Sequence, residues 1–347
     1  MKIIYKILIL FFLGFTFSSC ATTIKVSVEH PPIADMRGVK KVAVIPFEDF
    51  TKTGYDPMII SNILGFLFWG DRSSVSHHEG VGTKLIRKAI VEEMSSAIIN
   101  TGVYALIDSE SLVGVDTQDY YKFVDVFIVG ELSNIESTVN THETTTNEKQ
   151  SDGSYKKVTT RYDSRDVRLD FNYRFIRAKN REILYTVKKS GYKSAREDSA
   201  RRLISAEDMG VSIVKEQLSK MYRELVPWTD IEKRKLMDDT MKKKDPSMKD
   251  ALKLIDAKNY AAALQIYNTV YKKTSNYAAG YNAALLTEIL GDLNEALKMM
   301  GELLARVTRD SKSSKFAEKT RVAIAKEFSR MQKYYIDART LMDYRKR

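Results

Sequence analysis

One stretch decides the fold of this 347-residue chain: Val167-Arg168-Leu169-Asp170-Phe171-Asn172-Tyr173-Arg174-Phe175. Apolar side chains alternate with charged or amide side chains, which is the period of a strand with one buried face and one solvated face. A second apolar segment, Ile183 to Ser190, follows across the turn Ala178-Lys179-Asn180. The sequence therefore predicts two antiparallel strands of a half-buried sheet.

Two further segments are expected to be buried strands, because they are rich in β-branched residues. They are Val39 to Phe47 and Val124 to Leu132. Between them, Thr83 to Asn100 has apolar residues at helical spacing, and a long helix is expected over about Glu197 to Val226. This order predicts an α+β fold in which residues 38–228 form an α/β sandwich, with a mixed sheet and helices on one face.

The longest polar run of the chain lies between Glu136 and Arg165. Threonines alternate with charged residues on both sides of Asp152-Gly153, a dipeptide typical of the tight turn of a β-hairpin. Because the arms have almost no apolar face, we predict a hairpin over residues 136–168 that projects into solvent. The same polarity disfavours a pore, since strands that span a bilayer need one apolar face over about 9–11 residues.

An apolar segment, Ile59 to Trp69, precedes the first predicted helix. Ordinary core packing is one interpretation of it. The other is an exposed loop that docks a partner or dips into a bilayer through Phe66, Phe68 and Trp69. The sequence leaves both interpretations open.

The C-terminal part contains an internal repeat. The segment Ala257 to Leu264 recurs as Leu290 to Leu297, a period close to the 34 residues of tetratricopeptide repeats. We expect an all-α domain of such helical repeats over residues 250–347, after a linker over residues 229–249. Phe316 to Tyr344 is expected to form a degenerate third pair of helices, and an unrelated bundle of helical hairpins is the alternative.

These repeats are expected to present a groove to a protein or peptide partner. The residues predicted to contact that partner are Tyr260, Tyr267, Tyr281, Asn282 and Leu285.

The N-terminus has the pattern of a bacterial secretion signal that leads to the single cysteine of the chain. A short basic start precedes an apolar run that ends at Phe17 and is too short to span a bilayer. The residues before Cys20 resemble the lipobox of bacterial lipoproteins, with Phe17 in place of the usual Leu. We expect a signal peptide over residues 1–19, lipid on Cys20 and a lipidated tether over residues 20–37; an incidental cysteine is the alternative.

Lipidation predicts that the chain is exported and held at a bacterial membrane, more specifically at the outer membrane, where it faces the periplasm. With its one cysteine acylated, the fold has no internal disulfide. The net charge is +11, and basic residues cluster over 174–202 and 233–249. Nucleic acid is not expected as a partner, because exported lipoproteins rarely meet it. The basic surface either faces anionic headgroups or the cell wall, or is simply solvated.

Motifs for catalysis are weak. His77-His78-Glu79 is the only histidine cluster, adjacent histidines point in different directions, and no third ligand follows at a recognisable spacing. We find no serine elbow, no catalytic cysteine and no paired-carboxylate motif. We therefore expect no enzymatic activity, no cofactor and no metal, and a metal-dependent enzyme is the disfavoured alternative.

Short motifs at Val42 to Asp49, Ala105 to Asp108 and Asp125 to Glu131 resemble a superfamily of exported lipoproteins. That superfamily includes the curli secretion channel CsgG, the penicillin-binding-protein activator LpoB and the TolB amino-terminal domain. The whole layout, with Ile24 to Pro32, resembles a bacterial lipoprotein family that joins such a domain to C-terminal tetratricopeptide repeats. The resemblance to CsgG implies an oligomeric outer-membrane pore, and the resemblance to LpoB implies regulation of a cell-wall enzyme.

Together these features predict a non-catalytic outer-membrane lipoprotein that acts as a protein-interaction scaffold through its repeats. The alternative is a component or regulator of a secretion-channel or cell-wall-synthesis assembly, which would include a homo-oligomer.

Overall fold

The structure is a computed structural model that describes residues 22–46, 83–112, 114–198, 200–239, 244–310 and 315–346. Cys20, the segment Ile59 to Trp69 and the pair His77-His78 lie outside these residues. The chain forms two compact units. We call Pro32–Trp228 the α+β unit, and we call Met1–Pro31 together with Thr229–Arg347 the helical unit. In sequence, the α+β unit is thus an insertion into the helical unit.

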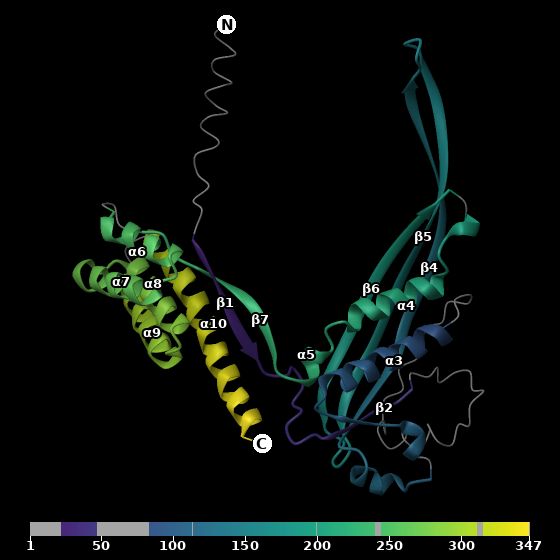
Figure 1. The fold of residues 1–347 in the computed structure, drawn as a ribbon, viewed down its shortest axis with the longest axis horizontal. Helices are drawn as coiled ribbons and strands as arrows, with labels where there is room; N and C mark the ends of the chain where they lie inside the picture. The colour runs from purple at the N-terminus through teal and green to yellow at the C-terminus, as the bar shows by residue number, and fades with distance from the viewer. Residues whose placement is uncertain are drawn as a thin grey trace. The chain divides into compact units, whose positions relative to one another are not determined.

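The α+β unit is built on a five-stranded sheet of order β3-β2-β4-β5-β6. The strands are β2 (Lys41–Val44), β3 (Ala105–Ile107), β4 (Val126–Lys149), β5 (Tyr155–Arg177) and β6 (Ile183–Glu197). β2 is parallel to both β3 and β4, whereas β4, β5 and β6 are antiparallel. The helices α3 (Lys84–Thr101) and α4 (Ala206–Leu218) cover one face of this mixed sheet (Figure 1). The predicted α+β class is confirmed.

The alternating stretch of β5 supplies the centre of the core. Val167, Leu169, Phe171, Tyr173 and Phe175 are all at most 1% exposed. They pack against the apolar faces of α3 and α4. Successive residues of β4 point to opposite faces, so Phe127 and Val129 join a second cluster beneath the short helices η1 (Ser109–Leu112) and η2 (Thr117–Lys122).

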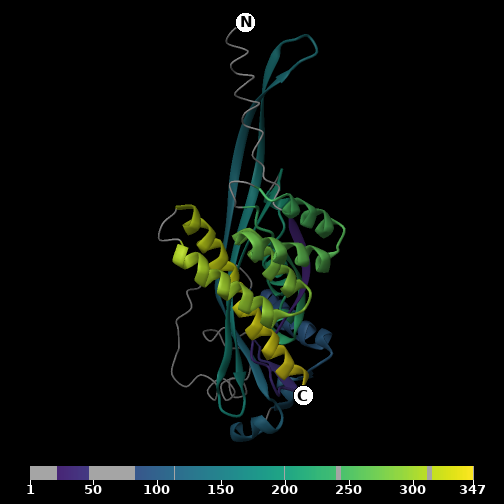
Figure 2. The same ribbon diagram turned by 90° about the vertical axis from the view of Figure 1, so that its left-hand side faces the viewer.

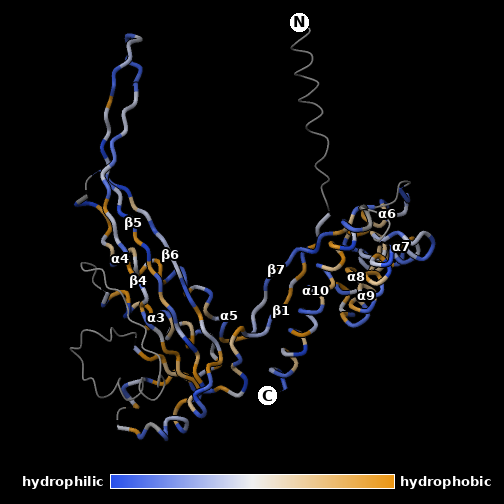
Figure 3. Tube along the Cα trace, turned by 180° about the vertical axis from the view of Figure 1, so that it is seen from behind, coloured by the Kyte–Doolittle hydropathy of each residue, from blue (hydrophilic) through white to orange (hydrophobic). Residues whose placement is uncertain are grey.

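The hairpin is an extension of the core strands rather than a separate element. β4 and β5 stay paired from Val126 and Arg177 to Lys149 and Tyr155, with one irregularity near Leu132. Gly153 takes the positive φ of 84° that the turn requires. β6 pairs with β5 only as far as Asp163. Beyond that residue β4 and β5 continue as a narrow two-stranded ribbon, whose strands we call the arms (Figure 2). The arms are mostly hydrophilic (Figure 3).

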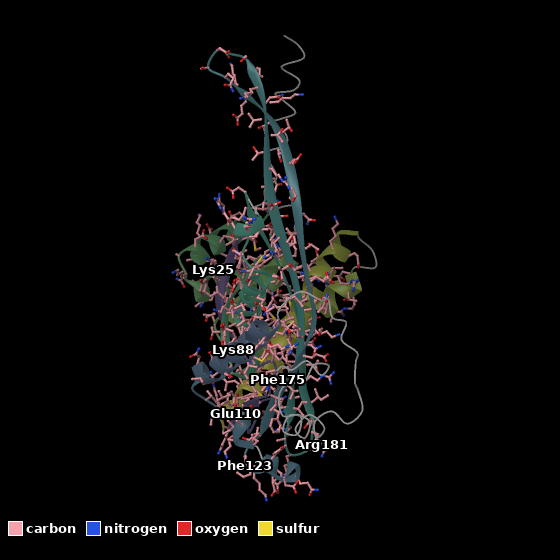
Figure 4. All side chains as sticks on the ribbon, turned by 90° about the vertical axis from the view of Figure 1, so that its right-hand side faces the viewer. Lys25, Lys88, Glu110, Phe123, Phe175 and Arg181 are labelled. Atoms are coloured by element: carbon pink, nitrogen blue, oxygen red, sulfur yellow. The ribbon has the colours of Figure 1, made fainter. Side chains whose placement is uncertain are left out.

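The opposite end of the sheet carries the turn between β5 and β6 and the loop after η2. Arg181 and Phe123 are labelled there in Figure 4, and Phe175 lies between that end and the hairpin. The sequence between β6 and Pro227 differs from the expected single helix. It forms η3 (Ala200–Arg202), then α4, then the short helix α5 (Tyr222–Leu225). Ser205 interrupts the helix because its side chain caps α4 by accepting a hydrogen bond from Asp208 N.

In the described part of the helical unit, five helices pack in chain order, each against the previous one. They are α6 (Pro246–Asp256), α7 (Tyr260–Thr274), α8 (Tyr277–Ile289), α9 (Leu293–Asp310) and α10 (Lys315–Arg345). The expected third helix pair is wrong, because α10 is one helix of 31 residues. Its sequence contains no glycine or proline that would end it.

The expected tether and linker also differ from the structure. β1 (Thr23–His30) lies within the segment predicted as a tether, and β7 (Trp228–Lys235) lies within the predicted linker. The two strands form a two-stranded sheet. Burial explains why this segment forms a strand rather than a free tether, because Ile24 and Val28 of β1 are 4% and 1% exposed.

The close contact between α3 and α4 generates a prediction. A methyl group added at Gly210 would lie 2.5 Å from Cδ1 and 2.9 Å from Cγ1 of the buried Ile86. We expect Gly210→Ala to lower the free energy of unfolding by about 1–2 kcal/mol, since overpacking exceeds the gain in helix propensity. Urea unfolding followed by circular dichroism measures this.

Two variants control for that result. Ile86→Val removes the nearest clashing atom, so the double variant should lose less than the sum of the single losses. Gly301→Ala meets its nearest atom, Phe328 Cε2, at 3.3 Å and should stay within about 1 kcal/mol of the wild type. Equal losses for Gly210→Ala and Gly301→Ala would contradict the packing argument.

Candidate interaction site

Helix α8 is buried around its whole circumference. All eleven residues from Ala278 to Glu288 are buried. α7 and α9 pack against it. A further side of α8 is covered by residues Arg234–Asp239, which are the last two residues of β7 and the four that follow it. We call these residues the cover segment.

Asn282 holds the cover segment by its backbone. The side-chain oxygen of Asn282 accepts a hydrogen bond from Met237 N at 2.8 Å, and its amide nitrogen donates to Met237 O at 2.9 Å. Asn282 is only 1% exposed. Both hydrogen bonds go to main-chain atoms, so this contact recognises an extended backbone rather than a particular side chain.

The cover segment runs antiparallel to α8. Asn276, at the start of the helix, donates to Asp239 Oδ1 at 2.6 Å. Near the other end, Arg234 Nη2 donates to Glu288 Oε1 at 3.2 Å. The spacings agree, because six helical residues from Asn282 to Glu288 span about 9 Å. Three extended residues from Arg234 to Met237 span about 10 Å.

Glu288 is the centre of a buried ionic cluster. Glu288 and Arg234 have side chains that are each 2% exposed. Arg330 of α10 donates through Nη1 to Glu288 Oε1 at 2.8 Å and also contacts Oε2 of the same carboxylate. Arg234 Nη1 donates to Glu232 Oε2 at 2.6 Å. Burial acts to raise the pKa of Glu232, but the hydrogen bond and charge of Arg234 outweigh it and lower that pKa.

The cluster also reaches the N-terminal strand. His30 at the end of β1 lies 3.2 Å from Glu232 and 3.7 Å from Asp337 of α10. Glu29 forms an ion pair with Arg345. Polar contacts with β7 and α10 thus hold the end of β1 in place within the helical unit.

The structure corrects the predicted groove. Tyr267, Tyr281, Asn282 and Leu285 are 0%, 7%, 1% and 0% exposed, whereas Tyr260 is only half-buried. Burial raises the pKa of Tyr267 to about 12. A partner cannot reach these four side chains in this conformation, because helix packing and the cover segment enclose them. The sequence signal that would have indicated the cover segment is Leu236-Met237, an apolar pair inside a charged run.

Two further properties concern the described residues as a whole. Within them, no three histidine, cysteine, aspartate or glutamate side chains come together as metal ligands would. No helix in the described part of the chain combines the length and hydropathy needed to cross a bilayer.

No protein-family model and no curated protein matches this chain. Solved structures that it resembles include a neuraminyllactose-binding hemagglutinin homolog from Helicobacter pylori, at 12% identity and a TM-score of 0.31. That likeness covers 56% of this chain and 88% of the homolog. A PelC dodecamer from Paraburkholderia phytofirmans is 10% identical with a TM-score of 0.26, over 57% of this chain and 96% of that one.

The lipoprotein GNA1162 from Neisseria meningitidis is 11% identical with a TM-score of 0.22, over 52% of this chain and 99% of that one. One of these similar proteins is therefore a lipoprotein. At such low identities and TM-scores, these likenesses carry no argument about the function of this chain.

The backbone contact of Asn282 is testable by truncation. Asn282→Ala leaves the amide and carbonyl of Met237 without their partner, so we expect the free energy of unfolding to fall by about 2–4 kcal/mol. Asn294→Ala on the exposed side of α9 should change it by no more than about 0.5 kcal/mol. Urea unfolding measures both, and similar values for the two variants would exclude the proposed contact.

The buried ion pair gives a second prediction. Glu288→Ala removes the buried carboxylate that Arg234 and Arg330 share, leaves Arg234 with Glu232 alone, and should cost about 3–5 kcal/mol. The double variant Arg234→Met/Glu288→Leu removes both charges and should be markedly less destabilised than Glu288→Ala. Thermal unfolding of the two proteins makes the comparison, and a larger loss in the double variant would contradict it.

Proposed function

We propose that this chain is a non-catalytic lipoprotein of the outer membrane that faces the periplasm and acts as a protein-interaction scaffold. The anchor is the lipid on Cys20. The signal pattern and the lipobox-like residues before that cysteine support this part of the proposal.

The observation that carries the interaction role is the β4–β5 hairpin. Beyond Asp163 its two arms have no third strand among the residues that the structure describes. A two-stranded ribbon without an apolar face is marginally stable in water. Its outer edges present unpaired backbone groups, which are a template for another strand. The hairpin is therefore the element best suited to bind a partner.

The helical unit supports a second contact on the same scaffold. The two copies of the sequence repeat occupy the same place in the pairs α6–α7 and α8–α9, at the turn between the two helices. This agreement favours the tetratricopeptide interpretation. A protein or peptide partner would meet the half-buried Tyr260 rather than the four enclosed residues of the predicted groove.

A second candidate function is that of a component of a larger assembly. The charges of two strands favour it. β4 pairs with β2 only over Val126–Ile128, and from Glu131 onward it carries four glutamates and one lysine. The edge strand β6 carries four basic residues and one glutamate. An acidic edge can pair with the basic edge of another copy, while like edges repel. Such a contact between unlike edges produces rings or filaments.

One crosslinking experiment in cells tests both functions. A photo-reactive amino acid is placed at the exposed Thr144 of the hairpin, at Tyr260, and at the exposed Lys88 of α3 as a control. We expect a crosslinked product of one defined mass from Thr144 and none from Lys88. Cys20→Ser should abolish that product, because the protein would lose its anchor.

The mass of the product separates the two candidates. A second, different protein supports the scaffold, whereas multiples of the mass of this chain support the assembly. Identical patterns at Thr144 and Lys88, or a native protein that incorporates no labelled palmitate, would overturn the proposed function.

A further inference from the structure

The chain is fixed to the helical unit almost immediately after the predicted lipid. Thr22 O accepts a hydrogen bond from Leu236 N at 3.0 Å. Only Ala21 separates Thr22 from Cys20. Since each residue spans at most about 3.6 Å, the α-carbons of Cys20 and Thr22 are at most about 7 Å apart. A lipid on Cys20 therefore brings the start of β1 to the headgroups.

Strand β1 cannot serve as a spacer. Ile24 and Val28 are buried, and His30 lies between Glu232 and Asp337. The ion pair between Glu29 and Arg345 adds a further attachment. The anchor thus holds the helical unit itself against the bilayer, and some surface of that unit next to β1 must face the lipid.

The outer face of the β1–β7 sheet is suited to that contact. Residues alternate in exposure along β1 and, from Ile231 on, along β7, so the buried residues Ile24, Val28 and Arg234 face the helices. The opposite positions are exposed except for the half-buried Glu29, and we call them the basic sheet face: Thr23, Lys25, Ser27, Glu29, Thr229, Ile231, Lys233 and Lys235. Lys25 is labelled in Figure 4.

The composition of this face matches an anionic lipid surface. It carries three lysines and one acidic residue, Glu29, whose charge is paired with Arg345, and Ile231 is 67% exposed. Lysine side chains attract anionic headgroups, and an exposed apolar side chain can insert between them. This attraction acts over a Debye length of about 8–10 Å, and the face begins beside the proposed anchor.

We propose that the basic sheet face is a membrane-contact surface that binds anionic phospholipid headgroups beside the lipid anchor. The inference rests on the proposed lipidation of Cys20 for its place in the cell, but the binding itself can be measured without any acyl group.

The experiment uses the mature chain, residues 20–347, with Cys20→Ser, so that no lipid contributes. Binding is measured by co-sedimentation with vesicles of phosphatidylglycerol mixed with phosphatidylcholine, and with vesicles of phosphatidylcholine alone. We expect binding only to the anionic vesicles. At about fivefold per lysine, Lys25→Glu/Lys233→Glu/Lys235→Glu should weaken it by about a hundredfold.

A matched variant changes the net charge equally at other exposed lysines. Lys84→Glu/Lys215→Glu/Lys326→Glu alters α3, α4 and α10 and should retain most of the binding. Urea unfolding checks that both variants are folded. Equal losses in the two variants would overturn the proposal, since net charge alone would then explain the binding.

A second measurement locates the contact. The Cys20→Ser chain contains no other cysteine, so Ser27→Cys can carry a single environment-sensitive dye. Its emission should shift to the blue with anionic vesicles, and the same dye at Thr144→Cys should not respond. No shift at position 27, or equally tight binding to a soluble anionic polysaccharide, would overturn the proposal. If the native protein incorporates no labelled palmitate, the proposed anchor fails while the vesicle result still stands or falls independently.

Discussion

The helical unit depends on the extended chain that returns to it from the α+β unit. Its central helix, α8, is apolar on nearly all sides, so two neighbouring helices cannot remove it from water completely. The cover segment completes the burial of α8. It is held by hydrogen bonds between the Asn282 side chain and the backbone of Met237, and by the Arg234–Glu288 ion pair. A buried charge or amide is tolerated only with a partner, so these contacts fix the path of the segment as well as covering the helix.

The same contacts determine how the N-terminal strand β1 is connected to the fold. β1 precedes the α+β unit in sequence and β7 follows it, and their pairing closes the helical unit around the point of insertion. The segments predicted as a tether and a linker therefore fold as two paired strands of the helical unit.

The paired strands β4 and β5 lie in two different environments along their length. Near α3 and α4, β5 alternates between buried apolar and exposed polar residues, and the burial of the former stabilises the pairing. Beyond Asp163 the register continues without that burial. The ribbon is thus held at its base by the core, while its far part has polar side chains and edges that no other strand of the described residues pairs with.

Local patterns in the sequence determined the α+β class, the strand at Val167 to Phe175, the helix α3 and the turn at Asp152-Gly153. Each depends on the periodicity or backbone preference of neighbouring residues, which a single sequence displays. Tertiary structure alone decided that Thr23–His30 pairs with Trp228–Lys235 and that Asn282 faces the chain's own backbone. Those contacts join residues far apart in sequence, and the short charged strands around them have no local pattern that distinguishes a paired strand from a linker.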